Sequence, residues 1–146
     1  MFRSLIATRE DVVALVLRLA LGIVMFPHGA QKVFGWFGGF GLSGTTAFFQ
    51  SMGIPYIFAV LAIAAEFLGS LGLLAGFLTR IAALGIAAVM LTATFMVHWP
   101  IGFFMNWSGT LKGEGFEYHL LAIGIAVALM IRGGGTASVD RALTRS

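Results

Sequence analysis

The residues of this chain that could carry ligand or proton chemistry stand inside or beside long apolar segments. His28 and Lys32 are four positions apart and therefore share one face of a helix. A neutral imidazole and a protonated amine can both donate hydrogen bonds to the carbonyl oxygens of a quinone. We therefore predict a pocket for a small molecule with a polar head and an apolar body. Its expected ligand-binding residues are His28, Gln31, Lys32, Trp36, His98, Trp99, Glu117 and Tyr118.

Other chemistries remain open for this set of side chains. The three His and two Glu in question are His28, His98, His119, Glu114 and Glu117. Imidazole and carboxylate suit zinc or iron, but the spacing matches no specific metal motif, so no metal site is predicted. Haem ligation by His28 and His98 is a weaker alternative. The simplest alternative is a hydrogen-bonded cluster that orders the neighbouring loops without binding any ligand.

Arg18 and Glu66 are the charged residues placed most deeply in apolar sequence. A lone charge there costs at least about 2.5–3.5 kcal/mol, so a partner is expected. We predict a buried bridge between these two residues that fixes how the first and second helices pack. They are also the candidate catalytic residues, because a buried carboxylate beside a cation can supply or tune a proton route. A partner for either charge from another subunit is the remaining alternative.

The amino-acid composition indicates whether the folded chain is surrounded by lipid or by water. Hydrophobic residues make up 59% of the 146 residues and charged residues 10%, against about 45–50% and about 25% in soluble domains. This excludes a water-soluble enzyme and predicts a single domain over 1–146, an all-α integral membrane four-helix bundle. Its spans are expected at about 12–34, 55–77, 81–98 and 116–131, of which the last is short. Because the chain has no Cys, disulfides, iron–sulfur clusters and dithiol redox chemistry are excluded.

The connections between these spans are unequal and set the topology. A tight turn at 78–80 makes an antiparallel hairpin of spans two and three, whereas 35–54 and 99–115 are long, glycine-rich and aromatic. Both long connections must then lie opposite the two termini. The terminal side carries Arg3, Arg9, Arg80, Arg132, Arg141 and Arg145, against Lys32 and Lys112 on the other side. This charge bias predicts cytoplasmic termini and a pocket near the periplasmic face.

Small residues recur along two spans at the spacing of helix–helix interfaces. They are Ala65, Gly69, Gly72 and Gly76 in the second span, and Gly124 and Ala128 in the fourth. In lipid, close backbone approach through small residues holds helices together. We expect these faces to pack within the bundle or against another subunit, either a second copy or a partner redox subunit. The few scattered cations form no nucleic-acid-binding patch, so the lipid bilayer is the main expected partner.

The ordered set of these residues resembles the DoxX family of bacterial membrane proteins. The matching runs are Arg18-Leu19-x-Leu21-Gly22, His28-Gly29-x-Gln31-Lys32-x-Phe34-Gly35, Glu66-Phe67-Leu68-Gly69, Gly76-Phe77-Leu78-Thr79-Arg80, His98-Trp99, Glu117-Tyr118 and Ser138-Val139-Asp140-Arg141. The resemblance implies four transmembrane helices in the bacterial inner membrane. From this resemblance we expect functional roles for eight membrane-embedded residues: Arg18, His28, Gln31, Lys32, Glu66, His98, Glu117 and Tyr118.

Within that family, some members are subunits of thiosulfate–quinone oxidoreductase and others are described as oxidoreductases linked to oxidative or quinone stress, while many have no demonstrated activity. The resemblance extends to the four-helix class of vitamin K epoxide reductase, but that enzyme uses a Cys pair that this chain lacks. We therefore expect a membrane subunit of a quinone-linked oxidoreductase or redox-stress system. It has no nucleotide-binding or haem-attachment motif, so it has no intrinsic cofactor and its electron donor must be another protein.

Two other functions are alternatives to this hypothesis. A non-catalytic assembly subunit would need only the small-residue faces and structural bridges. A small transporter would need a continuous polar path, which the almost entirely apolar cytoplasmic half of the third and fourth spans does not favour.

Overall fold

The helix boundaries follow from local capping chemistry. A computed structural model describes residues 2–144, in the order α1 (Phe2–Ile6), α2 (Val12–Phe34), η1 (Trp36–Gly38), α3 (Gly41–Ser51), α4 (Tyr56–Ala75), α5 (Thr79–Ala93), η2 (Thr94–His98), α6 (Glu117–Arg132) and α7 (Val139–Thr144). Asp11 starts α2 by accepting a hydrogen bond from the Ala14 amide at 3.1 Å. Gly35 and Gly76 end α2 and α4 in the left-handed conformation. Helices and connecting segments make up the whole described part, which confirms the all-α class.

The surface of the long helices is that of a protein surrounded by lipid. Val12–Phe34, Tyr56–Ala75 and Thr79–His98 are each long and apolar enough to cross a membrane. Large apolar side chains point outward along the helices, with Ile23, Leu68 and Leu121 each more than 60% exposed. Such a surface would be unstable in water and is favourable in a bilayer. α6 has 16 residues and packs beside α5 and α2 to complete a helical membrane bundle.

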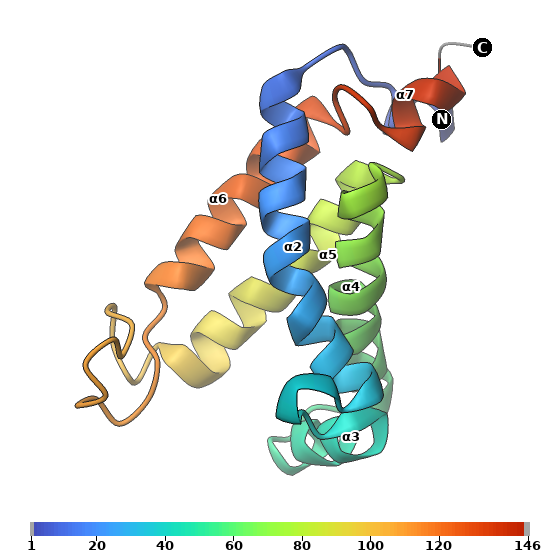
Figure 1. The fold of residues 1–146 in the computed structure, drawn as a ribbon. Coiled ribbons are helices and arrows are strands. Elements are labelled where there is room, and N and C mark those ends of the chain that lie inside the picture. Colours follow the sequence, from blue (N-terminus) through green and yellow to red (C-terminus); the bar gives the residue numbers. More distant parts are fainter. Residues whose placement is uncertain (1, 145–146) are drawn as a thin grey trace.

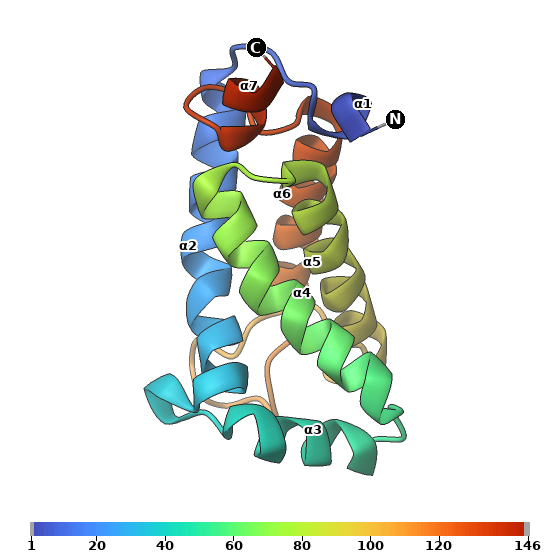
Figure 2. The same cartoon turned by 90° about the vertical axis from the view of Figure 1, so that its right-hand side faces the viewer.

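The two termini lie at one end of the bundle, as the connection lengths predict (Figure 1). The short helices α1 and α7 cover that end, and α3 with residues 99–116 occupies the opposite end (Figures 1 and 2). Arg145, one of the cations used to orient the chain, lies outside the described residues. The assignment of the terminal end to the cytoplasm stays a prediction.

The helices pack as two pairs that separate toward one end. α2 runs antiparallel to α4, and α5 runs antiparallel to α6 (Figure 1). α2 approaches α4 most closely at Gly29, where a Cβ atom would stand 2.6 Å from the Phe67 Cα. Near the α4–α5 turn, α5 packs on α4 through Gly69 and Ile86. From there, the α5–α6 pair diverges from the α2–α4 pair toward the end that carries α3 (Figure 1).

The helix α3 is an element that the sequence did not predict. It lies within the first long connection and runs across the end of the bundle, at a steep angle to the spans (Figure 2). Its 11 residues include glycine, serine and threonine, which are weak helix formers. Packing against α2 and α4 therefore supports this helix. As a result, the wide end of the bundle is covered by folded chain.

Candidate functional site

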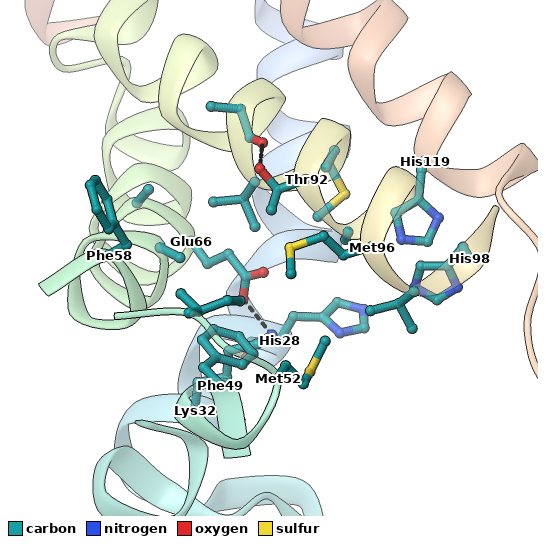
Figure 3. A pocket seen from close by; sticks show the side chains of 18 of the residues that line it. His28, Lys32, Phe49, Met52, Phe58, Glu66, Thr92, Met96, His98 and His119 are labelled. Carbon is teal, nitrogen blue, oxygen red and sulfur yellow. Dashed lines mark hydrogen bonds and ion pairs between the residues drawn. The ribbon is translucent and has the colours of Figure 1, made fainter. Parts of the chain in front are cut away.

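A cavity of about 940 Å³ occupies the wide end of the bundle, between the two helix pairs. Most of its walls are apolar side chains of α3, α4 and α5. Polar residues of the long helices and of the 99–116 connection also line it, and Figure 3 shows six of them: His28, Lys32, Glu66, Thr92, His98 and His119. The other polar lining residues are Glu114 and Tyr118. This volume lies in the range of cofactor and small-molecule sites, which combine apolar walls with a few polar groups.

An ion pair between α2 and α4 forms the polar centre of this cavity. Lys32 Nζ lies 2.5 Å from Glu66 Oε2, and the side chains are 23% and 5% exposed, respectively. The contact of Gly29 with the Phe67 backbone brings the two helices together beside this pair. A buried carboxylate is costly without a counter-charge. The pairing with Lys32 offsets the charge of the carboxylate. Lys32 Nζ also lies 3.5 Å from the His28 carbonyl oxygen, which leaves one N–H group of the amine for a ligand.

Three imidazoles continue the polar lining from α2 to α6. His28 points into the space between the Lys32–Glu66 pair and the His98–His119 pair (Figure 3). The rings of His98 and His119 lie with their centroids 4.1 Å apart. His98 Nδ1 lies 2.8 Å from the Glu114 carbonyl oxygen. Because a carbonyl can only accept, Nδ1 must carry the hydrogen, which makes Nε2 the hydrogen-bond acceptor of the neutral His98 ring.

His119 is buried without a partner for one of its nitrogens. His119 is 7% exposed, and its Nδ1 atom has no hydrogen-bond partner among the described residues. An unpaired buried polar atom costs about 1–3 kcal/mol. Such an atom on the wall of a cavity is a site where a ligand or water can bind. Sequence reasoning placed His119 near the outer cluster but left it out of the ligand-binding set.

A π-helical turn positions His98. Over Thr94–His98 the backbone widens, and the Trp99 amide donates to the Thr94 carbonyl at 2.7 Å. The Thr94 hydroxyl donates to the Met90 carbonyl at 2.8 Å and closes the preceding turn. π-turns recur at functional sites because they redirect one side chain out of the regular helical order. Here the redirected residue is His98, which meets His119 from α6.

Tyr118 closes the side of the cavity between α2 and α6. Its hydroxyl donates to Met25 Sδ at 3.5 Å, and its ring lies 6.3 Å from that of His28 between centroids. These contacts lie in the seam between the two helix pairs. The seam is therefore filled by side chains at this height.

The predicted bridge between Arg18 and Glu66 is wrong. The guanidinium group of Arg18 donates five hydrogen bonds to backbone carbonyl oxygens at the terminal end of the bundle, at 2.6–3.3 Å. Nε donates to Gly134, Nη1 donates to Leu73 and Leu74, and Nη2 donates to Thr136 and Ala137. The carbonyls of Leu73 and Leu74 belong to the last turn of α4, where Leu73 also accepts from the Gly76 amide at 3.2 Å. Arg18 therefore joins the end of α4 to the segment before α7. Glu66 lies seven residues before Leu73, about 10 Å away along α4.

Four of the predicted ligand-binding residues do not line the cavity. Gln31 donates to the Phe37 carbonyl at 3.2 Å, and Trp36 packs on Phe34. Trp99 is stacked on Phe116. Glu117 accepts hydrogen bonds from the Met105 amide at 2.8 Å and the Trp107 indole at 3.4 Å. These contacts lie in or beside the two long connections, and for Glu117 this is the role that the alternative of a hydrogen-bonded loop cluster gives it.

The remaining predicted residues are brought together. His28, Lys32, His98 and Tyr118 all line the cavity, together with the predicted catalytic residue Glu66. Within the described residues, no three His, Asp or Glu side chains are grouped closely enough to hold a metal ion. The arrangement offers hydrogen-bond donors, a neutralised carboxylate and a series of imidazoles around a hollow that could hold one aromatic ring.

These features define the class of protein: a helical, multi-pass membrane bundle with a partly polar cavity at one end. Comparisons with known proteins agree with this class. The family model for DoxX matches residues 13–99, the region that supplies α2 to η2. The chain therefore belongs to the DoxX family.

Two curated relatives cover most of the chain. It is 33% identical over 136 residues to "Inner membrane protein YqjF" of Escherichia coli (strain K12), which covers 93% of this chain and 95% of that protein. It is 31% identical over 119 residues to "Putative oxidoreductase CatD" of Bacillus subtilis (strain 168), covering 82% and 79%. No solved structure matches the chain. Together with the apolar helices, the first of these relatives identifies an inner-membrane protein.

Proposed function

We propose that this chain is the membrane subunit of a quinone-linked oxidoreductase or redox-stress system and that it binds the quinone ring in the cavity at the wide end. The observation that carries the proposal is the neutral Lys32–Glu66 pair set among apolar walls beside His28. A quinone ring is apolar on its faces and accepts hydrogen bonds at two opposite oxygens. The name of the Bacillus subtilis relative, which includes the word oxidoreductase, is consistent with this class of function.

The cavity residues have separate tasks in this proposal. Lys32 and His28 donate hydrogen bonds to the ring oxygens and orient the ring. Reduction to the quinol adds two electrons and two protons to those oxygens, and oxidation of the quinol removes them. A partner electron-transfer protein exchanges the electrons. Glu66 and His28 exchange the protons with the ring, and the imidazoles of His119 and His98 extend the titratable side chains from this point toward the loop side.

Arg18 takes no part in the proposed proton route. Its guanidinium group is fully engaged by the five backbone carbonyls at the terminal end. Five N–H donors are all that a guanidinium has. Arg18 therefore has no hydrogen-bonding capacity left for a ligand, and its role in the proposal is to close the bundle at that end.

The proposal is tested by quinone binding with a matched pair of lysine variants. Wild type, Lys32→Met and Lys112→Met are purified in nanodiscs, and bound quinone is extracted and measured by mass spectrometry after incubation with menadione. Lys112 is exposed on the 99–116 connection and does not line the cavity. We expect K32M to lose about tenfold in affinity and K112M to stay within about twofold of wild type. Equal binding by the two variants would contradict the proposed site.

A non-catalytic assembly subunit is the second candidate, and one observation favours it. Gly124 of α6 is exposed and has open space where a Cβ would stand, so this small-residue face is unused within the chain. Small residues allow another helix to approach closely in lipid. In that case wild type binds no quinone in the experiment above, and His28→Ala leaves the activity of the assembled parent complex unchanged.

A further inference from the structure

The cavity has an opening between α4 and α5. The two helices touch near their shared turn through small residues, where Gly69 packs on Ile86 and a Cβ on Gly85 would lie 3.2 Å from the Ala65 Cβ. Farther from the turn they separate, as Figure 1 shows for the yellow and green helices. Ala65 and Gly85 line the cavity where the helices still touch. Beyond them the lining residues are Phe58, Leu61 and Ala62 on α4, and Ala88, Val89, Thr92 and Met96 on α5.

Several of the side chains that line the cavity here are also exposed. Phe58 is 60% exposed, Leu61 is 55% exposed and Met96 is 44% exposed. A residue that borders both the hollow and the outer surface marks an opening. Because this part of the surface belongs to the membrane spans, the opening faces hydrocarbon rather than water.

Other elements border the remaining sides of the cavity. Tyr118 fills the seam between α2 and α6 through its contacts with Met25 and His28. Phe48, Phe49 and Met52 of the α3 region line the outer end. On the opposite side, Met105 and Glu114 of the 99–116 connection complete the wall. Because Tyr118 fills the seam between α2 and α6, the gap between α4 and α5 is the side on which the cavity borders hydrocarbon.

The depth and charge of the polar groups limit what can occupy this route. Glu66 stands ten residues after the first residue of α4, or about 15 Å along the helix, and Leu61 and Leu68 on either side of it are exposed to lipid. A phospholipid keeps its charged head at the interface, because a charge moved to this depth is costly. The Lys32–Glu66 pair is already neutral as well. A neutral ring that carries a long hydrocarbon chain meets both conditions.

We infer that the gap between α4 and α5 is a lateral entrance from the bilayer for a quinone that carries an isoprenoid tail. The ring lies at the Lys32–Glu66 pair, and the tail passes over the small residues Ala62, Ala65, Gly85 and Ala88 into the surrounding lipid. This inference rests on the proposed function, and adds to it the class of quinone and the direction from which it enters.

The test compares two quinones that share a ring and differ in the tail. Phylloquinone carries an isoprenoid tail, and menadione has the same ring without one. Ala88 is exposed at the entrance, so Ala88→Phe narrows the tail path without filling the core. Ala20→Phe is the matched control, because Ala20 is an exposed alanine of α2 that does not line the cavity. Binding is measured in nanodiscs for wild type and both variants.

We expect A88F to lose about tenfold in affinity for phylloquinone while its affinity for menadione stays within about twofold. A20F should bind both quinones as wild type does. If A88F binds phylloquinone as tightly as A20F, the lateral entrance is wrong although the ring site stands. If wild type binds neither quinone, the proposed function fails and the entrance with it. Retained binding of menadione by A88F also shows that this variant is folded.

Discussion

Lys32 Nζ and Glu66 Oε2 lie 2.5 Å apart inside the bundle, one on α2 and the other on α4. Lys32 supplies the counter-charge that the buried carboxylate of Glu66 requires. The sequence had predicted Arg18 for this role. It also places a neutral but strongly polar group on the wall of an otherwise apolar cavity. The same contact therefore stabilises the α2–α4 packing and creates the centre of the candidate site.

Removal of the carboxylate should destabilise the fold and weaken ligand binding together. Glu66→Ala leaves Lys32 partly buried without its partner, and a broken buried pair costs about 3–5 kcal/mol when one member is removed. Because Lys32 is 23% exposed and can move toward solvent, we expect a loss near the lower end of that range. The measurement is the free energy of unfolding by denaturant in detergent micelles.

Glu10→Ala is the control for this variant. Glu10 also pairs with a cation, Arg141; the Glu10 side chain is 68% exposed and that of Arg141 is 11% exposed. Because water reaches this carboxylate and screens the pair, the substitution should cost about 1 kcal/mol, less than the loss of the buried Glu66. A Glu66 variant as stable as the Glu10 variant would show that the buried pair does not hold α2 against α4.

Arg18 should be essential for stability and energetically independent of Glu66. Arg18→Lys keeps the charge but offers three donors in place of a planar group with five, so several of the five carbonyls lose their partner. At about 1 kcal/mol per lost bond, we expect a loss of about 2–4 kcal/mol. Arg132→Lys, at a side chain 49% exposed, should cost about 1 kcal/mol or less.

The double variant Arg18→Lys with Glu66→Gln tests the independence of the two residues. Their effects on the free energy of unfolding should add to within about 0.5 kcal/mol, as they do for sites without shared partners. A coupling energy well above that value would revive the bridge that the sequence predicted.

The long helices could be predicted from the sequence because lipid imposes simple rules. Apolar runs of the right length must form helices in a bilayer, and α2, α4 and α5 with η2 satisfy them. The unequal connections then required both termini at one end, as observed (Figure 1). The helix α3 escaped prediction because its support comes from packing on α2 and α4, and no periodic pattern within its own residues records that contact.

The candidate site was predictable only in part, because pairing across helices depends on their relative shift. Helical spacing put His28 and Lys32 on one face, and both line the cavity. Which cation meets Glu66 depends on how far α2 slides along α4, and this is set by the close contact of Gly29 with Phe67. The role of His119 depends on the π-turn that brings His98 beside it, a backbone feature without a clear sequence signal.

Two residues that were predicted to bind the ligand should have little effect on it. Gln31 and Glu117 hydrogen-bond the long connections and do not line the cavity. Gln31→Ala and Glu117→Gln should therefore keep quinone affinity within about twofold of wild type, whereas His28→Ala should lose about tenfold. The measurement is menadione binding in nanodiscs. Equal losses in all three variants would move the binding site out of the cavity and onto the outer connections.

His119 should be a residue whose removal harms function without harming the fold. Its buried Nδ1 has no partner among the described residues. His119→Leu replaces the ring with an apolar side chain of similar size and removes the cost of that unpaired atom. Elimination of an unsatisfied buried group is neutral or stabilising, so the free energy of unfolding should stay the same or rise by about 1 kcal/mol.

His98→Leu is the informative comparison for His119, because His98 donates to the Glu114 carbonyl. Loss of that bond should cost about 1 kcal/mol of stability. Both variants should weaken quinone binding if the two imidazoles face the ligand, but only H98L should also destabilise the fold. A clear loss of stability in H119L would mean that its ring holds α6 in place. Unchanged binding in both variants would remove the imidazoles from the proposed proton route and leave Glu66 and His28 to exchange protons by another path.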